Sequence, residues 1–150
     1  MPFSADETLR SLKDFQRRTV EYVFHRMFLA ETPTRRFLVA DEVGLGKTMV
    51  ARGVIAKTLE HLKDSKARAD FVYICSNAAI AHQNVARLNV LGQKDFSLAS
   101  RLTLLPLHVK NLTTNRINFV SFTPGTAFDL KTQSGWLPER ILIFRMLKDS

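Results

Sequence analysis

The segment ADEVGLGKTMV, residues 40–50, constrains this chain more than any other stretch, because it joins a short apolar run to a helical pattern through two glycines. Gly46, Lys47 and Thr48 match the end of the phosphate-binding pattern G-x-x-x-x-G-K-[ST], while Asp41 occupies the place of its first glycine. A turn that enters a helix presents unpaired backbone N–H groups to an anion, and the helix dipole favours negative charge there. The sequence therefore predicts a phosphate-binding loop with an unusual first residue.

The residue types of this loop suit a triphosphate and its metal ion. Gly44 and Gly46 allow positive φ and a close approach of the backbone to phosphate. Lys47 reaches the β and γ phosphates as a mobile charge, and the Thr48 hydroxyl completes the coordination of Mg²⁺. An ordinary glycine turn of an αβ unit, without a ligand, is the alternative that these residues leave open.

Hydrophobic periodicity places the loop within an alternation of strands and helices. Continuous apolar runs of about five residues are typical of buried parallel strands, and apolar residues three and four apart indicate amphipathic helices. The expected elements are a helix over 12–28 that stops near Thr32–Pro33, a strand over 36–40, a helix from Met49, a strand over 71–75, a helix capped by Asn77 that reaches Leu88, strands over 101–107 and 117–122, and a helix from Pro138.

This order of elements predicts the fold class. Strands that alternate with helices through short connections favour an α/β fold, in which a mainly parallel sheet has helices on both faces. Phosphate loops commonly occur on that scaffold. The chain has no internal repeat and no Gly/Ser/Pro linker, so we treat residues 1–150 as one unit.

Composition limits the compartment and the partners. Twenty-two Lys and Arg against 14 Asp and Glu give a formal charge of +8, which favours polyanionic partners or solubility. The N-terminus lacks a secretory pattern, and no stretch approaches the length of a membrane span. Cys75 is the single cysteine and ends an apolar run, so we expect a buried thiol in a reducing, cytoplasmic setting without membrane association.

The string DEVGLGKT, residues 41–48, resembles the first motif of superfamily-two helicases of the SWI/SNF-like branch, where Asp is usual at the position of Asp41. The resemblance implies a P-loop (RecA-like) fold and an ATP hydrolase that uses ATP and Mg²⁺ to move along nucleic acid, usually double-stranded DNA. Lys47 and Thr48 take the catalytic roles, and Thr48 holds the metal. The implied nucleotide contacts are Gln16, Asp41, Glu42, Val43, Gly44, Leu45, Gly46, Lys47, Thr48 and Met49.

A glutamine upstream of the loop extends the resemblance. LKDFQRRTVEYV, residues 12–23, is similar to the helicase Q-motif region, which places Gln16 on the adenine edge. Its amide donates and accepts hydrogen bonds at once, as N7 and N6 of adenine require. A solvated helix glutamine is the alternative. Arg17 or Arg18 is a further candidate for contact with the nucleotide, and the sequence does not choose between them.

Two later segments match the places where such helicases contact nucleic acid. Residues 73–88 occupy the place of motif Ia, with Ser76 and Asn77 where a proline is common. Asn77 as a plain helix cap is equally compatible. TPGT, residues 123–126, resembles a backbone-binding T-P-G motif, with a simple turn after a strand as its competitor. The implied nucleic-acid contacts are Ser76, Asn77, Thr123, Gly125 and Thr126; the basic residues around them are Arg87, Lys94, Arg101, Lys110 and Arg116, and His82 is a surface or core residue.

The resemblance stops before two parts that a helicase-type ATPase needs. An acidic second motif that holds Mg²⁺ and an arginine finger from a second lobe do not occur in residues 1–150. We therefore expect this chain to be the N-terminal portion of the first RecA-like lobe, with an incomplete fold, weak nucleotide binding and almost no hydrolysis by itself. A second RecA-like lobe is then its expected partner.

Two other functions remain open at the level of sequence. One is a nucleotide-gated DNA- or protein-binding module without turnover, which the missing acidic motif suits. The other is a P-loop kinase or transferase, for which glycine is expected in place of Asp41. The sequence does not distinguish DNA from RNA, or strand separation from translocation.

Overall fold

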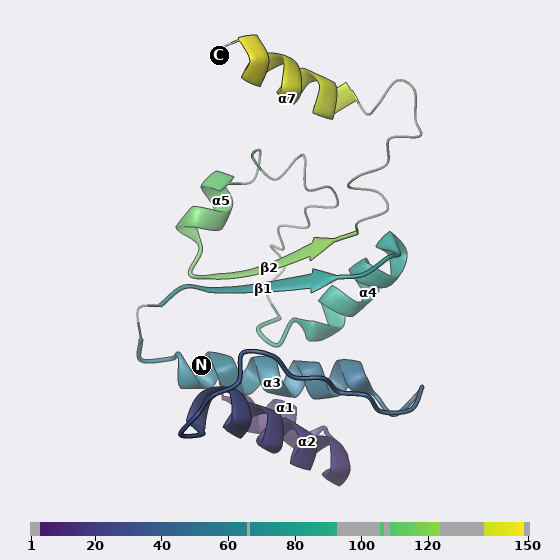
Figure 1. Cartoon of the computed structure of the whole chain (residues 1–150), viewed down its shortest axis with the longest axis vertical. Coiled ribbons are helices and arrows are strands. Elements are labelled where there is room, and N and C mark those ends of the chain that lie inside the picture. The colour runs from purple at the N-terminus through teal and green to yellow at the C-terminus, as the bar shows by residue number, and fades with distance from the viewer. Residues whose placement is uncertain (1–3, 66, 93–105, 107–108, 124–136, 149–150) are drawn as a thin grey trace. The chain divides into compact units, whose positions relative to one another are not determined.

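The computed structural model describes residues 4–65, 67–92, 106, 109–123 and 137–148 (Figure 1). They fall into two compact units. Residues 1–67 with 86–93 form unit 1, and residues 68–85 with 94–150 form unit 2. Unit 1 carries the glycine loop, and unit 2 carries the sheet.

The regular elements among the described residues of unit 1 are helices. The Ser4 Oγ accepts a hydrogen bond from Asp6 N and so caps the first helix. The helix predicted over 12–28 is confirmed, although its last turn is a π-helix and it ends at Leu29. The helix predicted from Met49 begins two residues earlier. The elements of unit 1 are α1 (Ala5–Arg10), α2 (Asp14–Phe24), η1 (His25–Leu29) and α3 (Lys47–His61).

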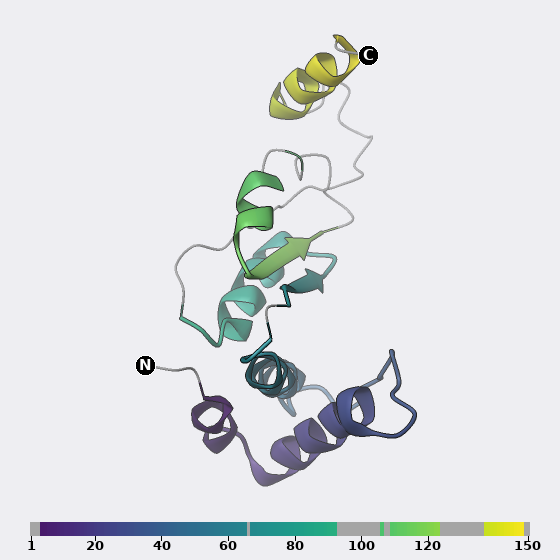
Figure 2. The same cartoon turned by 90° about the vertical axis from the view of Figure 1, so that its left-hand side faces the viewer.

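The core of unit 1 lies where α2 crosses α3. Val20 and Val50 are 0% and 1% exposed and pack together with Leu12. Gly53 makes this crossing possible, because a Cβ at residue 53 would lie 2.6 Å from Val20 Cγ2. Figure 1 and Figure 2 show the two helices side by side, so the start of α2 is held against the helix that follows the glycine loop.

The strand predicted over 36–40 is wrong. These residues form no strand in the structure, and the described strands pair only with each other. Leu38 is 83% exposed, and Val39 alone of this run packs on the core of unit 1. A short apolar run becomes a strand only where a neighbouring strand supplies hydrogen bonds, and no described residue does so here.

Unit 2 is built on a two-stranded parallel sheet, which confirms the strands predicted over 71–75 and 117–122. Phe71 and Phe119 face each other in the register, with ring centroids 4.9 Å apart. The Asn84 amide donates to the Tyr73 hydroxyl at 2.7 Å and ties the helix after β1 to the sheet. The elements are β1 (Ala69–Ile74), α4 (Ala78–Leu88, which continues into unit 1), α5 (Val109–Thr114), β2 (Ile117–Phe122) and α7 (Leu137–Lys148).

The structure is thus mixed α/β with a small parallel sheet. The helices expected after Asn77 and at Pro138 are confirmed as α4 and α7, the latter from one residue earlier. The strand expected over 101–107 lies outside the described residues except for Pro106. Among the described helices, none combines the length and apolar character needed to cross a membrane.

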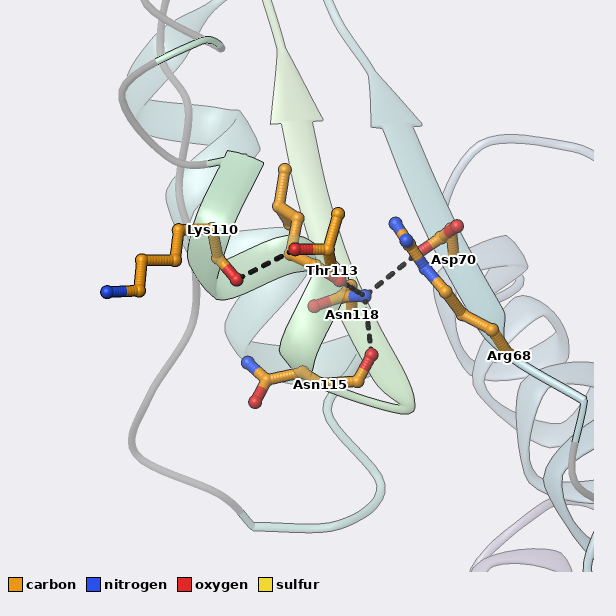
Figure 3. A network of polar contacts seen from close by, with 7 residues as sticks. Arg68, Asp70, Lys110, Thr113, Asn115 and Asn118 are labelled. Atoms are coloured by element: carbon orange, nitrogen blue, oxygen red, sulfur yellow. Dashed lines mark hydrogen bonds and ion pairs between the residues drawn. The ribbon is translucent and has the colours of Figure 1, made fainter.

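A buried asparagine joins β2 to β1 and α5 (Figure 3). Asn118 is 4% exposed, and its Nδ2 donates to Asp70 Oδ1 at 2.8 Å and to the Leu112 carbonyl at 3.0 Å. A third, longer contact reaches the Asn115 carbonyl at 3.3 Å. Asp70 is held in turn by Arg68 at 2.9 Å. Because buried polar groups are costly without partners, this network fixes how α5 enters β2.

We expect Asn118→Ala to lower the free energy of unfolding of unit 2 by about 2 kcal/mol, since three acceptors lose their donor. Urea denaturation followed by circular dichroism measures the change. Asn115→Ala is the matched control, because Asn115 is exposed and contributes only its main-chain carbonyl. Equal losses in the two variants would contradict the role of the Asn118 side chain.

Candidate nucleotide-binding loop

The two loop glycines have the backbone conformation that the sequence predicts. Gly44 has φ +90° and Gly46 has φ +80°, in the left-handed region that favours glycine. Gly46 is also the N-cap of α3, and its carbonyl accepts from Met49 N at 2.8 Å and Val50 N at 3.2 Å. The loop therefore turns directly into the first turn of the helix.

This turn leaves donors available at the start of α3. The main-chain N–H groups of Gly46, Lys47 and Thr48 have no acceptor among the described residues. Such groups at a helix N-terminus carry partial positive charge and bind anions. The backbone here can accordingly hold a phosphate group.

Lys47 folds back over the loop. Its Nζ donates to the Asp41 carbonyl at 2.9 Å and to the Glu42 carbonyl at 3.0 Å, and the residue is exposed. Neutral carbonyls are weaker partners for an ammonium group than phosphate oxygens are. An incoming phosphate can thus replace these contacts with charge-assisted ones.

Asp41 fits the loop without strain. Among the described residues only glycines have positive φ, so the position that the general pattern gives to glycine accepts a side chain here. The Asp41 Oδ2 atom is shielded from solvent and has no hydrogen-bond donor among the described residues. A shielded carboxylate oxygen without a donor is costly, which makes it a place for a water molecule or a ligand donor.

Gln16 holds the loop to the start of α2. It is 7% exposed, its Oε1 accepts from Lys13 N at 3.0 Å, and its Nε2 donates to the Leu45 carbonyl at 2.9 Å. The alternative of a solvated glutamine is therefore wrong. The partner Leu45 lies 29 residues away in the sequence, and no periodic pattern could have revealed it. Contact with adenine stays a prediction.

The remaining expected nucleotide contacts are other residues of the loop and of the first turn of α3. Glu42, Val43 and Leu45 are exposed, whereas Thr48 and Met49 are half-buried. Within the described part of the chain, no group of three or more His, Cys, Asp or Glu residues gathers to hold a metal. Contact of Thr48 with Mg²⁺ stays a prediction. Of the two arginines after Gln16, Arg17 pairs with Asp14.

Three expected nucleic-acid contacts meet at one edge of the sheet. Ser76 and Asn77 follow β1, and Thr123 follows β2, whose last residue lies opposite the last residue of β1. Ser76 and Asn77 are exposed, while Thr123 is 2% exposed. The carboxyl edge of a parallel sheet is a common place for ligands. Gly125 and Thr126 lie outside the described residues.

The environment of these residues is partly as expected. Asn77 Oδ1 accepts from Ala79 N at 2.9 Å and Ile80 N at 3.2 Å, so its role as a helix cap is confirmed. The expected burial of the Cys75 thiol is wrong: β1 ends one residue earlier, and the half-buried Sγ contacts the Asn77 main chain.

His82 is exposed. The described basic residues Arg87, Lys110 and Arg116 are exposed as well, and Lys94 and Arg101 lie outside the described residues.

The geometry of the loop thus stands on its own features: two glycines with positive φ, free N–H groups at a helix start, and a lysine amine over loop carbonyls. Comparison with protein-family models, with curated proteins and with solved structures gives no match to this chain.

Proposed function

We propose that residues 41–48 bind the phosphates of MgATP and that this chain is part of an ATP-dependent helicase or DNA translocase of the SWI/SNF-like branch. The observation that carries the proposal is the turn at Gly44 and Gly46, which opens α3 with three free N–H groups beside the exposed Lys47 amine. This arrangement supplies the donors and the charge that a triphosphate requires.

Each residue then has a separate part in nucleotide binding. Lys47 exchanges its bonds to loop carbonyls for bonds to phosphate oxygens, and Gln16 holds the loop through Leu45. Thr48 would hold Mg²⁺, which supplies neutralisation of phosphate charge when it is bound. On nucleic acid, Ser76 and Asn77 offer exposed polar groups next to Thr123 at one sheet edge. A second RecA-like lobe would supply the arginine finger.

Isothermal titration calorimetry tests the nucleotide site in a protein where this chain is joined to a second lobe, because the chain by itself is expected to bind nucleotide weakly. MgATP should give saturable heat with one site per chain, and AMP should bind much more weakly because it lacks the β and γ phosphates that Lys47 contacts. Absence of heat with MgATP would refute the proposal. Equal affinity for AMP and ATP would also refute it, since the phosphate loop would then contribute nothing.

Stimulation of ATP hydrolysis by DNA distinguishes a helicase or translocase from a binding module that does not hydrolyse ATP. In a protein where this chain is joined to a second lobe, double-stranded DNA should raise the rate of ATP hydrolysis. If MgATP instead changes DNA affinity without being hydrolysed, the nucleotide-gated binding module replaces the motor as the function.

A further inference from the structure

An exposed aromatic pair lies on unit 1. Tyr22 on α2 and Phe37 in the segment after η1 are in edge-to-face contact, with ring centroids 5.7 Å apart. Tyr22 is 59% exposed and Phe37 is 38% exposed. Exposed rings that support each other offer a ready surface on which a planar group can stack. Neither ring takes part in the glycine loop.

Arginines without carboxylate partners accompany this pair. Arg18 lies one helical turn before Tyr22 and on the same face of α2, and Arg35 and Arg36 directly precede Phe37. All three are exposed, and none has an ion pair with a described residue. We call Arg18, Tyr22, Arg35, Arg36 and Phe37 the aromatic–arginine surface.

Nearby acidic groups do not cancel this charge. Asp14 is paired with Arg17, and Glu21 is paired with Lys57 of α3. Within residues 25–40, Glu31 is the one acidic residue in the sequence. The surface therefore carries uncompensated positive charge, which favours a polyanion over a neutral or cationic partner.

The backbone under the surface is fixed by the turn that follows α2. Thr34 N donates to the Arg26 carbonyl at 2.9 Å and returns the chain to the π-helical turn. The Thr34 hydroxyl donates to the Arg36 carbonyl at 2.8 Å and accepts from Arg36 N at 3.3 Å. These bonds hold the main chain that carries Arg35, Arg36 and Phe37. Less conformational entropy is therefore lost when a ligand binds to these residues.

We infer that the aromatic–arginine surface binds single-stranded nucleic acid, with a base stacked on the Tyr22 ring and phosphates on the arginines. Ring faces together with guanidinium groups match the alternating bases and phosphates of a strand. An acidic peptide would use the charge but not the rings. Apart from Arg18, which is also a candidate contact with the nucleotide, this surface shares no residue with the proposed nucleotide site, so it is assayed without ATP or Mg²⁺.

Fluorescence anisotropy with a fluorescein-labelled oligothymidylate of about 20 nucleotides measures this binding in the whole chain. Tyr22→Leu should weaken affinity about tenfold, within the range for loss of one stacked base, and Tyr22→Phe should retain affinity because it keeps the ring. Arg18→Gln should lower the magnitude of the salt slope by about 0.7, as expected for one phosphate contact on a single strand.

Control variants distinguish binding at this surface from nonspecific electrostatic binding to the whole chain. Arg145→Gln on α7 removes the same charge from another exposed position and should leave the salt slope unchanged. Equal effects of Arg145→Gln and Arg18→Gln would overturn the inference. Wild-type affinity in both Tyr22→Leu and Phe37→Leu would overturn it as well. Displacement of the oligonucleotide by polyglutamate at equal charge would assign the surface to acidic proteins instead.

Discussion

Replacing Lys47 with alanine should weaken MgATP binding by about 100-fold. Two charge-assisted hydrogen bonds to phosphate contribute about 3 kcal/mol together, and each 1.4 kcal/mol corresponds to tenfold in affinity. Lys47 is exposed, and among the described residues it donates only to the Asp41 and Glu42 carbonyls, so its loss costs little folding stability. Calorimetric titration of the variant with MgATP measures the effect.

The control for this prediction is Lys148→Ala on α7, which removes the same charge from the last turn of an exposed helix. It should bind MgATP like the parent chain. If the two variants lose equal affinity, binding reflects net charge and not the loop. If Lys47→Ala retains full affinity, the triphosphate does not lie at α3.

The outcome at residues 36–40 shows what an apolar run cannot reveal. Residues 71–74 and 117–122 have the same character and do form strands, because they pair with each other in parallel register. The run over 36–40 has no such neighbour among the described residues, and Val39 alone joins the core. Strand formation depends on a partner elsewhere in the chain, which local hydrophobicity does not encode.

Helices and the loop backbone were more accessible to prediction. The helical spacing of six apolar residues predicts the buried face of this segment: Phe15, Val20, Val23, Phe24, Met27 and Phe28. Val20, Val23 and Phe24 are buried and Met27 and Phe28 are half-buried, whereas Phe15 is 41% exposed. Glycine at 44 and 46 predicts positive φ because other residues rarely adopt it, and both glycines have it. These conclusions rest on local chemistry, for which neighbouring residues suffice.

Contacts between distant segments were not predictable in the same way. The Q-motif resemblance directs attention to Gln16 and predicts a contact with adenine, but it gives no sign of the bonds from Lys13 N and to the Leu45 carbonyl that the structure shows. The packing of α2 against α3 brings the Gln16 amide to the loop. This packing depends on the combined shape of several side chains, which the sequence of one segment does not reveal. The same packing makes Gln16 part of the loop's support.

Substitution of Gly46 by alanine should therefore lower the free energy of unfolding of unit 1 by about 3 kcal/mol. An alanine at φ +80° costs about 1 kcal/mol. Its Cβ would lie 2.5 Å from Gln16 Nε2, so the amide must move. Movement of a side-chain end is easy in itself, but it breaks the bonds to Lys13 N and the Leu45 carbonyl, at about 1 kcal/mol each.

Gly44→Ala is the matched control, because Gly44 has φ +90° and an added Cβ would meet no described residue within 4 Å other than its two neighbours in the chain. It should lose about 1 kcal/mol in urea denaturation, from the backbone conformation alone. In the double variant Gln16→Ala/Gly46→Ala the clash is absent and the two Gln16 bonds are lost only once, so the combined loss should be smaller than the sum of the single losses by about 2 kcal/mol. Additive losses, or equal losses for Gly44→Ala and Gly46→Ala, would show that Gln16 does not support the loop.

If Gln16 does support it, MgATP affinity should fall in Gly46→Ala further than in Gly44→Ala, since the free N–H groups at the start of α3 are oriented by this same turn.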